Sequence, residues 1–301
     1  MILTGIGDEA GNALSVQIAA AQELSWSHLE LRNVEVPGFP VGNVHEIAEP
    51  AFELLCEMLA TAGLGVAGFG SSIGNWASRI ADPFEISLQQ AARAIPRMTR
   101  LGCRIIRVMS YAIEKNADGS DAAEQFAPER FRRLRDLQAR FQDAGIIMVH
   151  ENCMNYGGMS IAHALETLEN VPGLRWVFDT GNPVFNEDRS HPGQRQDAWE
   201  FYQAVQPAIS HLHVKDGVWN PDRNDCDYTL PGAGDAQVAR ILTDAKRSNY
   251  DGFVSIEPHL AVVFHATPPQ GNSLDPVAKA AEQYQVFVRY GQALRDLLSS
   301  L

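Results

Sequence analysis

The stretch MVHENCMNYGG (148–158) begins as the end of an apolar run and changes abruptly into His150, Glu151 and Asn152. The run that it ends, IIMV (146–149), is typical of a buried strand. A carboxylate at the end of such a strand must be solvated, paired or bound to a metal ion, because burying it alone is costly. Three later strands of the chain end in the same way.

Short β-rich runs alternate with longer amphipathic segments along the whole chain. Eight runs fit strands, at 2–7, 27–32, 65–70, 104–110, 146–152, 175–181, 209–216 and 253–258. Helical patterns lie between many of them, at 15–24, 49–63, 87–102, 128–145 and 236–252, and several end in glycine just before the next strand. Right-handed crossover helices make successive strands parallel. Eight such units predict an α/β protein, a (β/α)₈ TIM barrel.

The barrel is expected to be a single domain over residues 1–301, because no linker, low-complexity tract or charge run divides the chain. The segment 275–298 is expected to form a final helix that covers the barrel. Four aromatic residues lie in the longer connections after strands, and they could line a pocket or pack on the rim. They are Trp76, Phe185, Trp219 and Phe264.

Composition restricts the class of partner. A formal net charge of −13 argues against nucleic acid and against an anionic membrane surface, both of which attract basic patches. No apolar run approaches the roughly 18 residues of a membrane span, and the N-terminus does not resemble a signal peptide. Four cysteines occur without a C-x-x-C pair, which favours reduced thiols. We therefore expect a cytoplasmic protein with a small-molecule substrate.

Charged and imidazole side chains gather where the last four strands end, which is the face that carries the active site in barrels of this kind. They are Glu151, Asp179, the set His211, His213 and Lys215, and Glu257. Because side chains alternate along a strand, the two histidines and the lysine share one face. Carboxylates with imidazole suit one divalent cation, with Mn²⁺ the first choice and Mg²⁺, Co²⁺ or Zn²⁺ as alternatives. Glu151, Asp179, His213 and Glu257 would supply four ligands.

The sequence resembles the xylose-isomerase-like TIM-barrel superfamily of sugar isomerases and epimerases. The matching segments are LELR (29–32), VHEN (149–152), VFDTGN (177–182), HLHVKD (211–216) and SIEP (255–258). The resemblance implies that metal ligands come from the last four strands. It also implies that His213 is the histidine ligand, and that His211 contacts a ligand side chain or the substrate.

The predicted activity is a metal-dependent isomerase or epimerase that acts on a keto-sugar or related polyol through a cis-enediolate. In this hypothesis the ion chelates a carbonyl and the adjacent hydroxyl, and Glu151 and Glu257 approach the sugar from opposite sides to move a proton. Lys215 would donate to a substrate oxygen, or form a salt bridge with Asp216 or Glu257. Further candidate substrate contacts are His211, Asn182, Glu30, Arg32 and Trp219.

Other functions remain open at this point. Asn182 and Lys215 stand where ketose 3-epimerases commonly have a histidine and an arginine. This difference keeps a metal-dependent lyase or dehydratase, or an enzyme that cleaves 3-keto-glycosides, as the alternative. A non-catalytic sugar-binding subunit would belong to another class.

The stretch GIGDEAG (5–11) resembles the glycine-rich turn of a dinucleotide-binding fold, but Asp8 and Glu9 would repel the pyrophosphate. A homo-oligomer is a further open alternative.

Overall fold

The computed structural model describes residues 1–261 and 276–301, and eight parallel strands form its main sheet. The order across the sheet is β1-β12-β9-β8-β7-β6-β5-β2. The bounds are Ile2–Gly5 (β1), His28–Leu31 (β2), Gly65–Phe69 (β5), Ile105–Arg107 (β6), Ile147–Glu151 (β7), Arg175–Asp179 (β8), Ile209–Val214 (β9) and Phe253–Ile256 (β12). All eight predicted strands are present, each somewhat shorter than its sequence pattern. The prediction of a (β/α)₈ barrel is confirmed.

The sheet curves until its two outermost strands, β1 and β2, come together. An isolated parallel bridge joins Ile6 to Glu30, and the Thr4 hydroxyl donates to the His28 carbonyl at 2.8 Å. This contact nearly closes the barrel. It also brings Glu30, near the start of the chain, next to side chains from the far end of the sheet.

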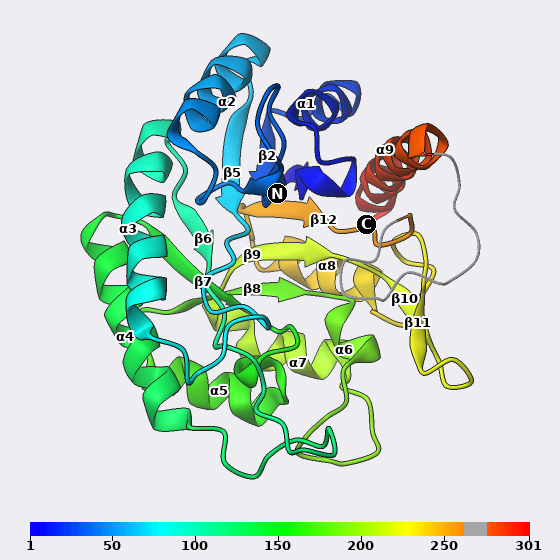
Figure 1. The fold of residues 1–301 in the computed structure, drawn as a ribbon. Coiled ribbons are helices and arrows are strands. Elements are labelled where there is room, and N and C mark those ends of the chain that lie inside the picture. The colour runs from blue at the N-terminus through cyan, green and yellow to red at the C-terminus, as the bar shows by residue number, and fades with distance from the viewer. Residues whose placement is uncertain (262–275) are drawn as a thin grey trace.

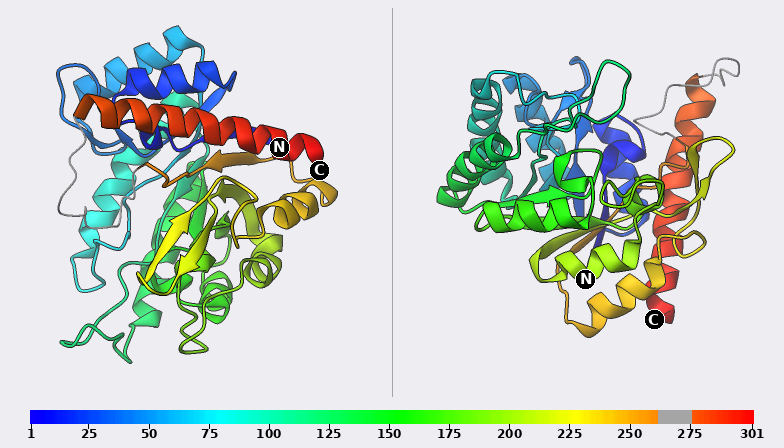
Figure 2. Two further views of the ribbon diagram at one scale, coloured as in Figure 1. Left: turned by 90° about the vertical axis from the view of Figure 1, so that its right-hand side faces the viewer. Right: turned by 90° about the horizontal axis from the view of Figure 1, so that it is seen from below.

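Helices surround the strands (Figure 1). Their bounds are Leu14–Glu23 (α1), Glu49–Ala62 (α2), Phe84–Leu101 (α3), Ala127–Asp143 (α4), Ile161–Asn170 (α5), Asn182–Phe185 (α6), Ala198–Val205 (α7), Val238–Arg247 (α8) and Pro276–Ser300 (α9). Short 3₁₀ turns cover Gly7–Glu9, Tyr156–Gly158 and Gln206–Ala208. Figure 2 shows α9, the predicted covering helix, running beside α1. No helix in the described ranges is long and apolar enough to cross a membrane.

Glycine ends two of the predicted helices as expected. Gly63 directly follows α2 with a φ of 67°, and Gly102 directly follows α3 with a φ of 65°. This left-handed backbone conformation costs glycine little. The prediction for α8 was too long, because the helix ends at Arg247 and not at 252. There Asn249 takes a φ of 57°, so the chain leaves the helix at an asparagine before it reaches Gly252.

The core lies between the barrel and its helices. Trp176 of β8 is fully buried, its ring 4.7 Å from that of His150 on β7 and 6.4 Å from that of Phe201 on α7. Burying aromatic side chains of this size contributes much of the stability of such a layer. The rigid strands thereby fix the direction of the side chains at their ends.

Two short hairpins lie outside the main sheet. One pairs β3 (Asn33–Val34) with β4 (Gly42–Asn43), and the other pairs β10 (Gly217–Asn220) with β11 (Asp225–Tyr228). In Figure 1 the arrowheads of β8, β9 and β12 point to the side of the molecule where α6 and the β10–β11 hairpin lie. These elements therefore surround the carboxyl ends of the strands, where the candidate site lies.

Candidate active site

Four ligand-type side chains converge at the carboxyl ends of β7, β8, β9 and β12. Glu151, Asp179, His213 and Glu257 each offer one ligand atom, and these atoms all lie within 4.8 Å of one another. All four residues are buried. The structure thus brings together the whole set that the sequence singled out as metal ligands.

Asp179 is held by the turn that follows its strand. One carboxylate oxygen, Oδ1, accepts the backbone N–H groups of Gly181 at 2.8 Å and Asn182 at 2.7 Å. The Asn152 side chain bonds both the N–H and the carbonyl of Asp179, at 2.9 and 2.8 Å. The other oxygen, Oδ2, has no hydrogen-bond donor among the described residues and lies 3.2 Å from Lys215 Nζ. One oxygen is therefore fixed by the backbone and the other is directed into the site.

His213 is oriented from the opposite side by Glu30. Its Nε2 lies 3.1 Å from both oxygens of that carboxylate, which also accepts Ser255 Oγ at 2.6 Å and lies 2.8 Å from His211 Nε2. The second ring nitrogen, Nδ1, lies 3.4 Å from Glu151 Oε1 and makes no hydrogen bond within the described part of the chain. A carboxylate behind a histidine in this way fixes the ring and the nitrogen that faces a metal.

Two arginines hold the two glutamates. Arg107 Nη1 donates to Glu151 Oε2 at 2.8 Å, and Arg32 Nη1 donates to Glu257 Oε1 at 2.6 Å. Lys215 Nζ lies between two carboxylates, 2.9 Å from Glu257 Oε2 and 3.2 Å from Asp179 Oδ2. Each glutamate therefore has one oxygen paired with an arginine.

Carboxyl groups outnumber basic side chains in this buried cluster. Six carboxyl groups, those of Asp8, Glu9, Glu30, Glu151, Asp179 and Glu257, lie beside Arg32, Arg107, Lys215 and the His213 imidazole. Burial and neighbouring carboxylates raise the pKa of Glu9 to about 8 and that of Asp179 to about 7, although Arg32 and Lys215 oppose the shift. A site of this kind favours an additional cation.

The same charges shift the other ligand-type groups. Burial would lower the pKa of His213, but Glu30 and Glu151 raise it to about 10. Burial would raise the pKa of Glu151, but Arg107 and His213 lower it to about 2. Lys215, His259 and Arg32 likewise hold the pKa of Glu257 well below its usual range, against the effect of burial. Both glutamates are therefore ionised at neutral pH.

The donor set fits a divalent cation. Three carboxylates and an imidazole are ligands for Mn²⁺, Mg²⁺, Co²⁺ or Zn²⁺. Two of the ligand-type atoms, Asp179 Oδ2 and His213 Nδ1, make no hydrogen bond in the described residues, and their charged neighbours lie 3.2 and 3.4 Å away. Both atoms can bind a cation once His213 has released the proton on Nδ1.

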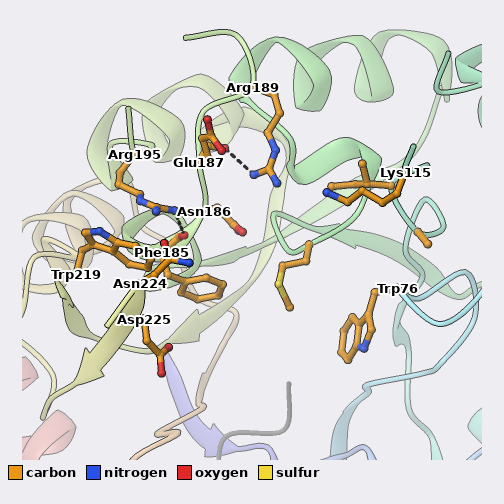
Figure 3. A pocket seen from close by; sticks show the side chains of 13 residues that line it. Trp76, Lys115, Phe185, Asn186, Glu187, Arg189, Arg195, Trp219, Asn224 and Asp225 are labelled. Carbon is orange, nitrogen blue, oxygen red and sulfur yellow. Dashed lines mark hydrogen bonds between the residues drawn. The ribbon is translucent and has the colours of Figure 1, made fainter. Parts of the chain in front are cut away.

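Two neighbouring spaces lie beside these residues. The inner chamber, of about 20 Å³, is lined by Glu151 and Glu257 together with Arg32, Trp76, Arg107, Cys153, Met154, Asn182, Phe185, Lys215 and His259. The outer chamber, of about 580 Å³, shares Trp76, Met154 and Phe185 with it and opens between the loops (Figure 3). A ligand can therefore extend from the carboxylates out into the larger space.

The other predicted site residues fall into three groups. Lys215, Arg32 and Asn182 line the inner chamber, whereas Trp219 lines the outer one. His211 and Glu30 are buried behind His213 and bond to each other. The structure places these two where they orient His213, and a direct contact with substrate stays a prediction for them. Of the rim aromatics, Phe264 lies outside the described residues.

The sequence did not single out Arg107, which lines the inner chamber. Arg107 ends β6 and its 5% exposure is low for a charged side chain. An arginine inside the apolar run RIIRVMS (104–110) was the available signal. A buried charge needs a buried partner, and here that partner is Glu151.

Comparison with known families agrees with this geometry. The model of the family described as xylose isomerase-like TIM barrel matches residues 18–286. The chain belongs to this family. The resemblance inferred from the strand-end motifs is confirmed. No curated protein matches the sequence significantly.

Solved structures of similar fold include other members of the xylose isomerase-like barrel type. A xylose isomerase-like TIM barrel protein from Mycobacterium smegmatis, in complex with magnesium, is 16% identical over 98% of this chain and 97% of that chain, with a TM-score of 0.64. The probable 3-DHS dehydratase AsbF from Bacillus anthracis is 15% identical over 98% and 99%, with a TM-score of 0.64. The D-psicose 3-epimerase from Clostridium cellulolyticum H10, with D-tagatose, is 14% identical over 100% and 99%, with a TM-score of 0.63. At these identities the likeness concerns the fold.

Proposed function

We propose that this protein is a divalent-metal-dependent isomerase or epimerase of a keto-sugar or related polyol. The observation that carries the proposal is the convergence of Glu151, Asp179, His213 and Glu257 on one point beneath a chamber. The family membership supports it, as do fold neighbours that include a D-psicose 3-epimerase and a protein in complex with magnesium. Mn²⁺ is the first choice of metal, with Mg²⁺, Co²⁺ or Zn²⁺ as alternatives.

These four residues would hold the ion, and His213 would present Nδ1 to it because Glu30 engages Nε2. When bound, the ion supplies Lewis-acid polarisation of a substrate carbonyl and stabilises the negative charge that develops on the substrate oxygens. Asp179 would act as a ligand only, since its other oxygen is bound by backbone N–H groups.

Glu151 and Glu257 are proposed to transfer the proton. They belong to strands separated by β8 and β9, so they approach the chamber from different sides of the site. One ionised carboxylate removes the proton from the carbon between the carbonyl and the hydroxyl. The other takes up a proton from solvent and passes it to the opposite face, and the first then releases its proton to solvent. Return to the same carbon gives an epimer, and return to the neighbouring carbon gives the aldose–ketose isomer.

Arg32, Arg107 and Lys215 are proposed to orient the reacting groups. Each arginine donates to one oxygen of a glutamate, and the other oxygens, Glu151 Oε1 and Glu257 Oε2, accept from Asn182 and Lys215. A bound ion or the transferred proton would take the place of these second contacts. Lys215 lines the inner chamber and has three donors on one ammonium, so it can also bond a substrate oxygen. The narrow chamber excludes most water from these groups.

A second candidate function, a metal-dependent lyase or dehydratase, is favoured by Lys215. The ammonium lies 2.9 Å from Glu257 Oε2 in the inner chamber. It could therefore protonate an oxygen that leaves from the carbon next to the enolate. A dehydratase is also among the proteins of similar fold. The two functions share the first proton transfer and differ in the product.

The proposed function predicts metal-dependent exchange of a substrate proton with solvent. The purified protein, loaded with Mn²⁺, is incubated in D₂O with a panel of ketohexoses and ketopentoses, and the C–H signal next to the carbonyl is followed by NMR. We expect this signal to disappear in at least one sugar, and to persist when the metal has been chelated. A dehydrated product would assign the lyase.

The control is heat-denatured protein with the same metal, which removes exchange catalysed by free ions. Binding of a sugar without exchange in any member of the panel would contradict the enzyme and indicate a non-catalytic sugar-binding subunit.

A further inference from the structure

The outer chamber is larger than a single sugar requires. Its volume of about 580 Å³ falls within the range of roughly 300–1,000 Å³ that is typical of pockets for drug-sized ligands. The inner chamber, in contrast, holds about 20 Å³, which is roughly the space of one water molecule or one carbonyl group. Most of the ligand must therefore lie in the outer chamber, and a lone monosaccharide would leave much of that space unfilled.

The outer chamber has a mixed lining, in which planar side chains stand on two sides among polar residues such as Asn186, Glu187 and Asn224. In Figure 3, Trp76 stands on one side of the chamber, and Phe185, Trp219 and Arg195 stand on the other. The Arg195 guanidinium lies over the Trp219 ring, 3.5 Å from its centroid. Trp76 is 38% exposed, a large apolar surface that faces the opening. Aromatic rings and stacked guanidinium groups both favour a planar aromatic ligand between them.

The cations of this chamber are already engaged by the protein. Lys115 and Arg189 both pair with Asp121, and Arg189 also donates to the Glu187 carbonyl at 2.9 Å. Arg195 donates to the Phe185 carbonyl. A phosphate group would need several free donors that converge on it. The chamber therefore suits an uncharged group better than a phosphate.

We propose that the outer chamber binds a planar aromatic group joined to the reacting sugar, so that the substrate is an aryl glycoside. This inference rests on the proposed function, because the inner chamber must hold the reacting end. A glycoside has no free carbonyl at its glycosidic carbon. The reacting carbonyl is therefore a ring ketone next to a hydroxyl, and this is the group that reaches Glu151 and Glu257.

The test measures binding by calorimetry with phenyl and methyl β-D-glucopyranoside, the corresponding galactopyranosides, and cellobiose. We expect the phenyl glycoside to bind at least about tenfold more tightly than the methyl glycoside of the same sugar. Trp219→Ala removes the ring on which Arg195 stacks, and Trp76→Ala removes the aromatic side chain on the opposite side of the outer chamber. Each substitution should reduce the phenyl-to-methyl ratio to about threefold or less. Neither side chain is buried, so both variants should fold.

Trp199→Ala is the matched control. Trp199 also carries a stacked arginine, Arg240, at 4.0 Å, but it lies on α7 outside the outer chamber. This variant should keep the wild-type ratio. Equal affinity for phenyl and methyl glycosides would overturn the proposal, and so would cellobiose that binds as tightly as the phenyl glycoside.

The outcome is separable from that of the proposed function. The aromatic preference needs no metal and should persist after chelation, whereas proton exchange should not. If free keto-sugars exchanged their proton but the phenyl and methyl glycosides bound equally well, only the proposal of an aryl glycoside substrate would be overturned. A Trp219-dependent preference would support aryl binding in the outer chamber. If that protein showed no metal-dependent exchange, either in free keto-sugars or in a phenyl glycoside with a ring ketone, the proposed enzyme would be overturned.

Discussion

Glu151→Gln and Glu257→Gln are each expected to lower the rate of substrate proton exchange by about 10²- to 10⁴-fold, the usual contribution of a general acid or base. Glutamine has the same shape but cannot take the proton. Both carboxylates are held ionised in the wild-type protein by Arg107 and by Lys215 with Arg32. The rates are measured by NMR in D₂O at saturating metal, and the metal content of each variant is determined in parallel.

Glu53→Gln serves as the control for this substitution, because Glu53 lies on α2 and pairs with Arg100 at the surface. It should exchange at the wild-type rate. If a variant retains the metal but no longer exchanges the substrate proton with solvent, the glutamate that was replaced takes part in proton transfer. Undiminished exchange in both Gln variants would contradict the proposed acid/base pair.

Arg32→Met is expected to reduce the free energy of unfolding by about 3–5 kcal/mol, the range found when one partner is removed from a buried ion pair. The guanidinium donates to Asp8 at 3.0 Å, Glu9 at 2.8 Å and Glu257 at 2.6 Å, and all four residues are buried. Methionine fills similar volume but leaves three carboxylates without their shared cation. Urea denaturation of metal-free protein measures the change.

Arg100→Met is the matched substitution at an exposed arginine, whose partner Glu53 is also exposed. Its effect should be much smaller, because solvent screens surface ion pairs. If both substitutions lowered the free energy of unfolding by the same amount, this would contradict the role of Arg32 as the cation that the buried carboxylates require.

The fold could be predicted because each strand and helix carries its own local signal. The run 146–152 shows a buried strand, and Gly63 and Gly102 mark the ends of α2 and α3. α5 and α7 did not appear among the predicted helices, although their first residues carried a signal. Ser160 and Asp197 accept the N–H groups of His163 and Glu200, which is the usual N-terminal cap.

The metal-ligand set could also be predicted, because the carboxyl ends of parallel strands meet on one face of a barrel. Contacts across the barrel could not. Arg32 and Glu257 are 225 residues apart, and Glu30 and His211 are 181 apart. Which partner a long side chain reaches depends on the curvature of the sheet and on its rotamer. The sequence therefore suggested Glu30 as a substrate contact, whereas the structure places it behind His213.

The outer chamber depends on four connections after strands and on the β10–β11 hairpin, which carries Trp219. Its walls come from the loops after β5, β6 and β7, from α6 with the segment that follows it, and from the hairpin. No pattern in these segments shows how they face one another. The sequence indicated the aromatic residues, and the structure brings them to one space.

Elemental analysis of the purified protein tests the metal centre most directly. The protein is stripped with a chelator, dialysed, incubated with Mn²⁺, Mg²⁺, Co²⁺ or Zn²⁺, and freed of unbound ions, and Asp179→Asn is treated in parallel. We expect about one divalent ion per wild-type chain and a much lower content in the variant, whose neutral amide is a weaker ligand. Wild-type protein that rebinds none of these ions would contradict the metal centre and the function proposed from it.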